Sequence, residues 1–324
     1  MSGALWLRTV MWLIGLLALF ALNALVGVYW ERKFIGHLQG RRGPLHHGWH
    51  GILQLPADMV KMISKEDILP DNADKWLFRL GPVAALVPAF TAFAALTFWP
   101  GGALLDMNHG LFFIFAFETL LPMAFVLIGW SSGNKFSLVG ALRAAAQLVS
   151  YEIPMLLAAL GVVLAAGSMR ITDIVAAQSG VWYVVKQPLG FAIFCVAVLA
   201  EMNRTPFDLP EAESELVAGY MTELPAMKFG LVQLSEYSVT FVGSYLIAVL
   251  FLGGWNMPLL PASPAWLLLK TVALMTVTMW FRGTFPRLRV DSLMSLSWKW
   301  LVPAALFNIM LVSALAIALG PKVF

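Results

Sequence analysis

The sequence predicts an all-α integral membrane protein with eight transmembrane helices and a short interfacial amphipathic helix in the first cytoplasmic loop. Of its 324 residues, 60% are hydrophobic and 12% are charged, whereas about 25% are charged in an ordinary soluble domain. Apolar runs recur along the chain, and about 20 apolar residues suffice for a helix to cross the hydrocarbon core. No segment alternates apolar and polar residues as the strands of a membrane barrel do.

Eight apolar runs are the predicted spans, and no long linker, internal repeat or low-complexity tract separates them. Residues 1–324 are therefore expected to form a single polytopic membrane domain. The first run is too long for the apolar region of a signal peptide and is interpreted as an uncleaved span. In chain order, the predicted spans are 6–30, 80–99, 111–130, 145–166, 188–202, 231–253, 264–281 and 300–320.

Lysine and arginine are distributed unequally between the loops. The odd-numbered loops hold 16 of the 21 basic residues, and the positive-inside rule places such loops in the cytoplasm. Both termini are then predicted to be periplasmic, with the protein in the bacterial inner membrane. Basic loops facing anionic lipid account for the net charge of +3, and nucleic acid is not an expected partner.

The first cytoplasmic loop contains a segment, 51–63, that is too short to span the membrane but carries one apolar stripe. Asp58 and Lys61 lie away from this stripe, which predicts an amphipathic helix in the interface plane. A helix packed on a partner protein is the alternative. Pro56 fits only if it lies in the first turn. The stripe consists of Ile52, Leu55, Met59 and Ile63.

Residues that carry cofactor chemistry are scarce. Cys195 is the only cysteine, which excludes an internal disulfide and a thiolate cluster for iron–sulfur or zinc. No glycine-rich nucleotide fingerprint is present. The histidines of "HHGWH" (46–50) are interrupted by glycine, which argues against a rigid helical metal site. No metal is expected, and redox cofactors must belong to partner subunits.

Negative charge is concentrated in residues 201–223. Pro206 and Pro210 stop the fifth span, and Asp208 with Glu211 resembles a capping box that starts a short helix. On such a helix Glu211 and Glu215 share one face and Glu213 points the opposite way. Coupled carboxylates can hold and move protons near neutral pH; a solvated acidic loop is the alternative. The acids are Glu201, Asp208, Glu211, Glu213, Glu215 and Glu223.

Four ionisable residues lie inside predicted spans, where charge is costly and usually lines a polar path or forms an ion pair. They are Glu118, Glu152, Glu236 and Lys270. Glu152 and Glu236 are close enough to the cytoplasmic ends to reach the interface instead, and Lys270 could pair with a neighbouring subunit. Glu118 is nearer to the middle of its span and is the stronger candidate for an intramembrane charge path.

Long motifs spread over nearly the whole chain resemble one family. "AEMNRTPFDLPEAESELVAGY" (200–220) closely resembles the signature of the H subunits of proton-translocating NADH-quinone oxidoreductase, respiratory complex I. The stretches that agree with it are "ERKFIGHLQGRRGP" (31–44), "LQLPADMVKMISKED" (53–67), "GWSSGNKFSLVGALRAAAQLVSYE" (129–152), "MKFGL" (227–231), "LFLGGW" (250–255) and "RLRVDSLMSLSWK" (287–299).

This resemblance implies a place and a function. Family members form the heel of the membrane arm, beside neighbouring membrane subunits, lipids and the hydrophilic arm that carries flavin and iron–sulfur clusters. They provide much of the chamber in which the substrate, a quinone, is reduced. The chamber and proton-coupling residues implied by the motifs are Glu31, Arg32, Lys33, Arg41, Arg143, Glu152, Arg204, Asp208, Glu211, Glu213, Glu215 and Glu223.

A physical hypothesis joins the acids to the chemistry. A transient quinone anion would raise the pKa of nearby carboxylates, so the loop would convert quinone reduction into proton movement toward Glu152 and Glu118. The amphipathic helix and the first span would frame a lateral entrance for the quinone tail. Ubiquinone and menaquinone are both compatible with this interpretation.

The sequence also departs from the family pattern at Leu45, His46, Met221 and Leu224, which replace polar residues near the chamber. Two other functions are alternatives. The membrane subunit of an energy-converting hydrogenase would share the same ancestry. A secondary transporter would usually show pseudo-symmetric halves.

Overall fold

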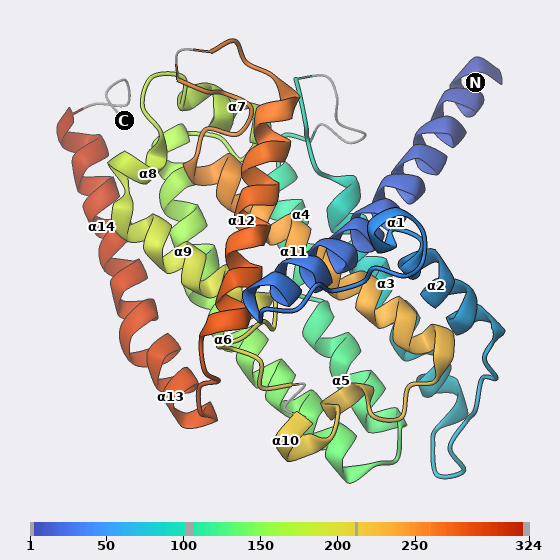
Figure 1. Ribbon diagram of the computed structural model, residues 1–324. Helices are drawn as coiled ribbons and strands as arrows, with labels where there is room; N and C mark the ends of the chain where they lie inside the picture. Colours follow the sequence, from blue (N-terminus) through green and yellow to red (C-terminus); the bar gives the residue numbers. More distant parts are fainter. Residues whose placement is uncertain (1–2, 101–106, 211–212, 259, 320–324) are drawn as a thin grey trace.

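The computed structural model describes residues 3–100, 107–210, 213–258 and 260–319, and over these ranges the chain is built from helices without a β-strand. Figure 1 shows them as a bundle in which α11 passes through the middle while the first part of α1 projects from one side. This confirms the predicted all-α class.

Capping side chains fix the first turns of two helices. Asp74 accepts hydrogen bonds from the amides of Trp76 and Leu77 and caps α3, and Ser263 caps α12 in the same way before Pro264. The helices of the bundle are α1 (Gly3–Leu38), α2 (Gln54–Ser64), α3 (Lys75–Ala94), α4 (Gly110–Glu118), α5 (Leu121–Ser131), α6 (Lys135–Ala166), α7 (Ile171–Ala177), α8 (Tyr183–Lys186), α9 (Pro188–Glu201), α10 (Glu213–Leu216), α11 (Ala226–Phe251), α12 (Pro264–Thr284), α13 (Val290–Ser295) and α14 (Val302–Leu319).

Within the described residues, seven helical segments are long and apolar enough to cross a membrane. They correspond to seven of the predicted spans; α4 with α5 forms one of them, and α13 continues into α14 through a π-helical turn. The remaining predicted span, 188–202, is α9, which has 14 residues. At 1.5 Å per residue α9 is about 21 Å long, shorter than a hydrocarbon core of about 30 Å, so helix length does not confirm the count of eight.

Two helices extend well beyond the spans that hydropathy predicts. α1 continues to Leu38, so Glu31, Arg32 and Lys33 lie on its last turns and not in a loop. α6 begins at Lys135, capped by Asn134, which places Arg143 on a rigid helix. Hydropathy marks the apolar part of a helix, whereas a helix can continue past the membrane surface.

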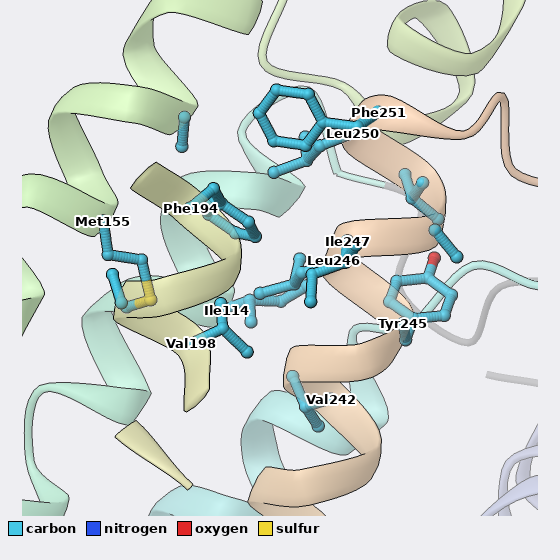
Figure 2. Packing of buried hydrophobic residues seen from close by; sticks show 14 of the residues in the cluster. Ile114, Met155, Phe194, Val198, Val242, Tyr245, Leu246, Ile247, Leu250 and Phe251 are labelled. Atoms are coloured by element: carbon cyan, nitrogen blue, oxygen red, sulfur yellow. The ribbon is translucent and has the colours of Figure 1, made fainter. Parts of the chain in front are cut away.

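α11 is the central helix of the core. Gly243 allows the close approach of α9, because a Cβ there would lie 2.7 Å from a methyl group of Val198. Figure 2 shows the apolar layer that surrounds the second half of α11, in which side chains such as Phe194, Leu250 and Phe251 pack together. The labelled side chains are buried and apolar apart from the hydroxyl of Tyr245, which donates to the carbonyl of Thr97 at 2.7 Å.

The predicted amphipathic helix is α2. It begins at Gln54, three residues later than predicted, and Pro56 lies in its first turn as expected. Leu55 is buried, but Ile63 is 66% exposed and Ile52 lies in the turn before the helix. The predicted stripe is therefore divided: Leu55 and Met59 border a groove beside α1 and α11, while Ile52 and Ile63 are exposed on the outside of the bundle.

Candidate functional site

A buried ion-pair cluster joins three distant helices and the loop after α9. The carboxylate of Glu31 accepts hydrogen bonds from Arg282 and from the hydroxyl of Tyr237, the latter at 3.0 Å. Arg204 lies 3.8 Å from the same carboxylate and 4.9 Å from the centre of the Tyr237 ring. Two guanidinium groups thus share one buried carboxylate, an arrangement that leaves positive charge on this wall.

This cluster lines a polar chamber of about 860 Å³. The charged groups that line it are mainly cationic, because four arginines and one carboxylate, Glu31, are found among its described lining residues. The polar lining residues are Glu31, Arg32, Gln39, Arg41, Arg204, Gln233, Tyr237 and Arg282. Such a cavity suits a polar headgroup that develops negative charge.

An apolar groove between α1, α2 and α11 adjoins the chamber. Its walls include Ala24, Leu55, Met59 and Met227, and it shares Arg32 with the chamber. The groove has a volume of about 150 Å³. An apolar groove that leads into a polar chamber fits a ligand with an apolar tail and a polar headgroup.

An ion pair stands where the groove meets the chamber. Arg32 donates to Asp58 at 2.8 Å, and Gln54 donates to the other oxygen of Asp58 at 3.0 Å. Burial alone raises the pKa of Asp58, but the hydrogen bonds from Arg32 and Gln54 outweigh it and hold the pKa below its ordinary value of 3.8. Asp58 is therefore ionised at neutral pH and ties α2 to α1.

The loop after α9 does not gather its described carboxylates into one cluster. Asp208 pairs with Arg287 at 3.2 Å, and Glu215 pairs with Arg143 at 2.5 Å. Glu223 accepts a hydrogen bond of 2.7 Å from the amide of Asn134. Each of these acids is held by a different helix or loop.

Cations from elsewhere in the chain thus offset Asp208 and Glu215, which the loop sequence alone does not reveal. The hydrogen bond from Arg143 and its positive charge lower the pKa of Glu215 below its ordinary value of 4.5. Glu211 lies outside the described residues, and so does the side chain of Glu213. The predicted helix is represented by α10, which has four residues.

Lys33 and Arg41 have different positions. Lys33 donates to the backbone carbonyl of Pro44 at 2.7 Å and to that of Arg42 at 3.4 Å. It thereby holds the turn after α1. Arg41, on that turn, lines the chamber.

Besides Glu31 and Asp208, three further carboxylates are almost fully enclosed in the described part of the bundle. Glu118, Glu201 and Glu236 are between 4% and 7% exposed. Glu201 borders two small cavities, one shared with Glu236 and the other with Glu118. The first has a volume of about 10 Å³, near the lower limit for one water molecule.

These buried carboxylates differ in their hydrogen bonds. The hydroxyl of Tyr220 donates to Glu236, whereas one oxygen of Glu201 has no hydrogen-bond partner in the described part of the chain. Glu152, half-buried on α6, is close enough to repel Glu118 and Glu201 electrostatically. A row of carboxylates therefore runs from Glu236 through Glu201 to Glu118 and Glu152.

Sequence reasoning counted Glu201 among the loop acids but not among the intramembrane ones. Its position as the last residue of an apolar helix was the available signal. Gln147 donates to the carbonyls of Ala200 and Phe207 at 2.8 and 2.7 Å and so fixes the chain where it leaves α9. This anchoring turns Glu201 inward.

Lys270 lies apart from these acids. Its ammonium donates to the carbonyls of Leu252, Gly254 and Asn256 at 2.6, 2.9 and 2.6 Å. It also lies 4.4 Å from the centre of the Trp182 ring. Lys270 thus contacts the turn that follows α11.

Metal-ligating groups do not cluster in the described ranges: no three His, Cys, Asp or Glu side chains there could hold an ion. His50 stacks edge-on against Trp49 and does not meet His46 or His47 in such a group. Cys195 is free and partly buried.

The chain is similar to known proteins over most of its length. Residues 11–313 match the family model described as NADH dehydrogenase. The chain is 48% identical over 305 residues to the H subunit of NADH-quinone oxidoreductase from Bacillus mycoides (strain KBAB4), with 92% of this chain and 91% of the relative covered. Proteins of the same name from Geobacillus sp. (strain WCH70) and Bacillus cereus (strain AH187) are 48% and 47% identical, with 91% and 92% of this chain and 91% of each relative covered.

Proposed function

This chain belongs to the NADH dehydrogenase family as a membrane subunit of NADH-quinone oxidoreductase, and on that premise we propose that it forms much of the chamber in which the quinone headgroup is reduced. The chamber lies at the junction with the hydrophilic arm. Flavin and iron–sulfur clusters belong to partner subunits there, and this chain contributes walls, charges and proton carriers. Its membrane is the bacterial inner membrane, with both termini periplasmic.

The observation that carries the proposal is the continuity of an apolar groove with a polar chamber. The groove beside Met59 and Met227 has the character that a polyisoprenoid tail requires, and it lies between α1, α2 and α11. The chamber beyond it is lined by Arg204 and Arg282. Their positive charges stabilise negative charge on a quinone oxygen as electrons arrive from the hydrophilic arm.

The coupling of quinone reduction to proton movement follows from the negative charge that the headgroup acquires. Reducing a quinone to a quinol takes two electrons and two protons, and the headgroup becomes negative before it is protonated. That charge disfavours ionisation of nearby carboxylates. Protons then redistribute along the buried row from Glu236 through Glu201 to Glu118 and Glu152, toward the neighbouring membrane subunits.

The loop after α9 acts through its ion pairs in this proposal. Glu215 is paired with Arg143 on α6, nine residues before Glu152 on the same helix. A charge change at the chamber that weakens one pair alters the field along α6. Asp208 and Arg287 form a second such pair; Glu31, Arg32, Lys33, Arg41 and Glu223 complete the proposed set.

Purification of the tagged chain with its partners tests complex membership. Flavin and iron–sulfur subunits should co-purify and support quinone reduction by NADH. Nickel–iron subunits would point to an energy-converting hydrogenase, and isolation alone with substrate uptake would point to a transporter.

Glu215→Gln tests the mechanism within that complex. The exposed carboxylate contributes little to packing, so assembly and electron transfer from NADH to an artificial acceptor should persist while quinone reduction falls. The matched control is Asp67→Asn, which removes an exposed acid paired with Lys228 at 2.7 Å on the same side. Full quinone activity of assembled Glu215→Gln would remove this residue from the mechanism.

A further inference from the structure

Four ionisable residues lie inside the predicted spans. Lys270 differs from the three glutamates among them, because its contacts are backbone carbonyls and an aromatic ring. Its ammonium reaches three backbone carbonyls at 2.6–2.9 Å. A carbonyl oxygen only accepts, so three such contacts need three N–H donors, which the charged ammonium has and a neutral amine lacks. The face of the Trp182 ring, 4.4 Å away, also favours a cation.

The three carbonyls belong to the turn at the end of α11. Gly253 and Gly254 have φ values of 72° and 53°, and this left-handed backbone turns the helix end back on itself. The carbonyl end of a helix carries partial negative charge and favours a cation. Lys270, reaching across from α12, therefore caps α11.

A second polar contact fixes the same turn from α7. Gln178 accepts from the amide of Gly253 at 2.9 Å and donates to the carbonyl of Val249 at 2.8 Å. Asn256 donates to the carbonyl of Val175 at 3.1 Å. The turn is thus held from two sides, and the ammonium has a defined and rigid site.

The site of the Lys270 ammonium lies further along α11 than the cavity beside the buried carboxylates. The cavity beside Glu118 is bounded by Gly243 and Leu246, and Leu252 is six residues further on, about 9 Å along the helix. Between them lies the apolar layer of Figure 2, which includes Leu250 and Phe251. None of the ion pairs found among the described residues includes Lys270.

We propose that Lys270 is a fixed cation that caps α11 and, together with the apolar layer, bars protons from crossing between the buried carboxylates and the outer face. It does not carry protons along the path. An ammonium with all three hydrogens engaged has none free to pass on, and a static positive charge beside a low-dielectric layer repels an entering hydronium ion. The inference rests on the proposed function, because it presupposes a proton path that must be closed on one side.

The test is passive proton entry into vesicles that contain the whole complex, recorded with an internal pH dye after an imposed pH step and without NADH or quinone. Lys270→Gln keeps two N–H donors for the turn and removes the charge. We expect passive influx to rise about tenfold, which corresponds to a barrier lowered by about 1.4 kcal/mol. Lys270→Arg, which keeps the charge, should retain the wild-type influx and stability.

Lys186→Gln is the matched control. It removes another lysine whose ammonium lies over an aromatic ring, 5.7 Å from the centre of Tyr183, but it leaves the cap of α11 intact and should not change influx. An assembled Lys270→Gln complex with wild-type influx overturns the proposal. Unchanged influx combined with fewer protons translocated per quinone would return Lys270 to the path.

A further variant separates the charge from the neighbouring ring. Trp182→Leu removes the ring beside the ammonium and leaves the charge and the three carbonyl contacts, so influx should stay at the wild-type level, and raised influx would overturn the proposal by showing that the ring and not the charge bars protons. Failure of the proposed function would be seen separately, as absence of NADH-dependent quinone reduction in the wild-type complex, because the influx assay uses neither substrate.

Discussion

Replacing Glu31 with glutamine tests the charge balance of the chamber wall. Glu31 is 6% exposed and is the anion to which both Arg204 and Arg282 are directed. Glutamine keeps the size of the side chain but removes its charge. Two guanidinium groups would then face each other across a neutral amide, in a wall that is already cationic.

The size of the effect can be worked out in two ways. Removing one partner of a buried ion pair costs about 3–5 kcal/mol. Counting contacts instead, two hydrogen bonds to a charged group, from Arg282 and Tyr237, are worth about 1.5–3 kcal/mol each. Arg282 is 31% exposed at its side chain and can turn into the chamber, which favours the lower end, a loss of about 3 kcal/mol in the free energy of unfolding.

Cys195 provides the assay because it is the only cysteine and is partly buried in α9. Pulsed alkylation of the intact complex at increasing temperature, read from the Cys195 peptide by mass spectrometry, reports unfolding of this subunit. A loss of about 3 kcal/mol lowers the midpoint by roughly 6–12 °C on the scale of soluble domains of 150–250 residues.

Asp58→Asn is the matched control. It makes the same change of charge in the pair with Arg32, where the side chains are 26% and 48% exposed, and exposed pairs contribute about 0–1 kcal/mol. Its midpoint should shift by no more than a few degrees. Equal midpoints for the two variants, or a larger shift for Asp58→Asn, would refute the assignment of Glu31 as a buried, shared anion.

Three further predictions concern the entrance, pH and topology. Met59→Glu places a charge in the apolar groove and should slow reduction of long-tailed quinones more than short-tailed ones, whereas equal loss for both would contradict the entrance. Because the folded-state pKa of Asp58 lies below 3.8, the Arg32–Asp58 pair stabilises the fold fully above that value and is lost only as pH falls through the lower folded-state pKa. The stability difference between wild type and Asp58→Asn should therefore stay constant between about pH 6 and 8 in the alkylation assay, and a difference that changes across this interval would show that another group titrates. Reporters fused after Phe324 should be periplasmic and those inserted within 66–75 cytoplasmic; a cytoplasmic carboxyl terminus would contradict the predicted topology.

The sequence by itself determines that this protein lies in a lipid bilayer and where most of its helices run. A continuous apolar run of about 20 residues crosses a bilayer as a helix, because only a helix or a closed barrel satisfies the backbone there and the strands of a barrel alternate apolar and polar residues. Hydropathy therefore places the central parts of α1, α3, α6, α11 and α12 without knowledge of their neighbours. Capping residues such as Asp74 and Ser263 then set the first turns.

Hydropathy is less informative where a helix leaves the membrane. Glu31 and Arg143 lie on helices that continue past their apolar parts, although the sequence places them in or at the edge of loops. The short α9 shows the reverse case, since an apolar run does not guarantee a helix of spanning length. Long motifs identify the family, but they do not give these boundaries.

Only the tertiary structure decides which charges meet. Glu31 and Arg282 are 251 residues apart, and Glu215 and Arg143 are 72 apart, so their pairing depends on the packing of whole helices and not on any local pattern. The same holds for Lys270, whose sequence position suggests a charge path while its contacts are carbonyls at the end of α11. A charged residue in a membrane must be satisfied by some partner, and whether that partner is a carboxylate, a carbonyl or a substrate is fixed only when the helices are packed together.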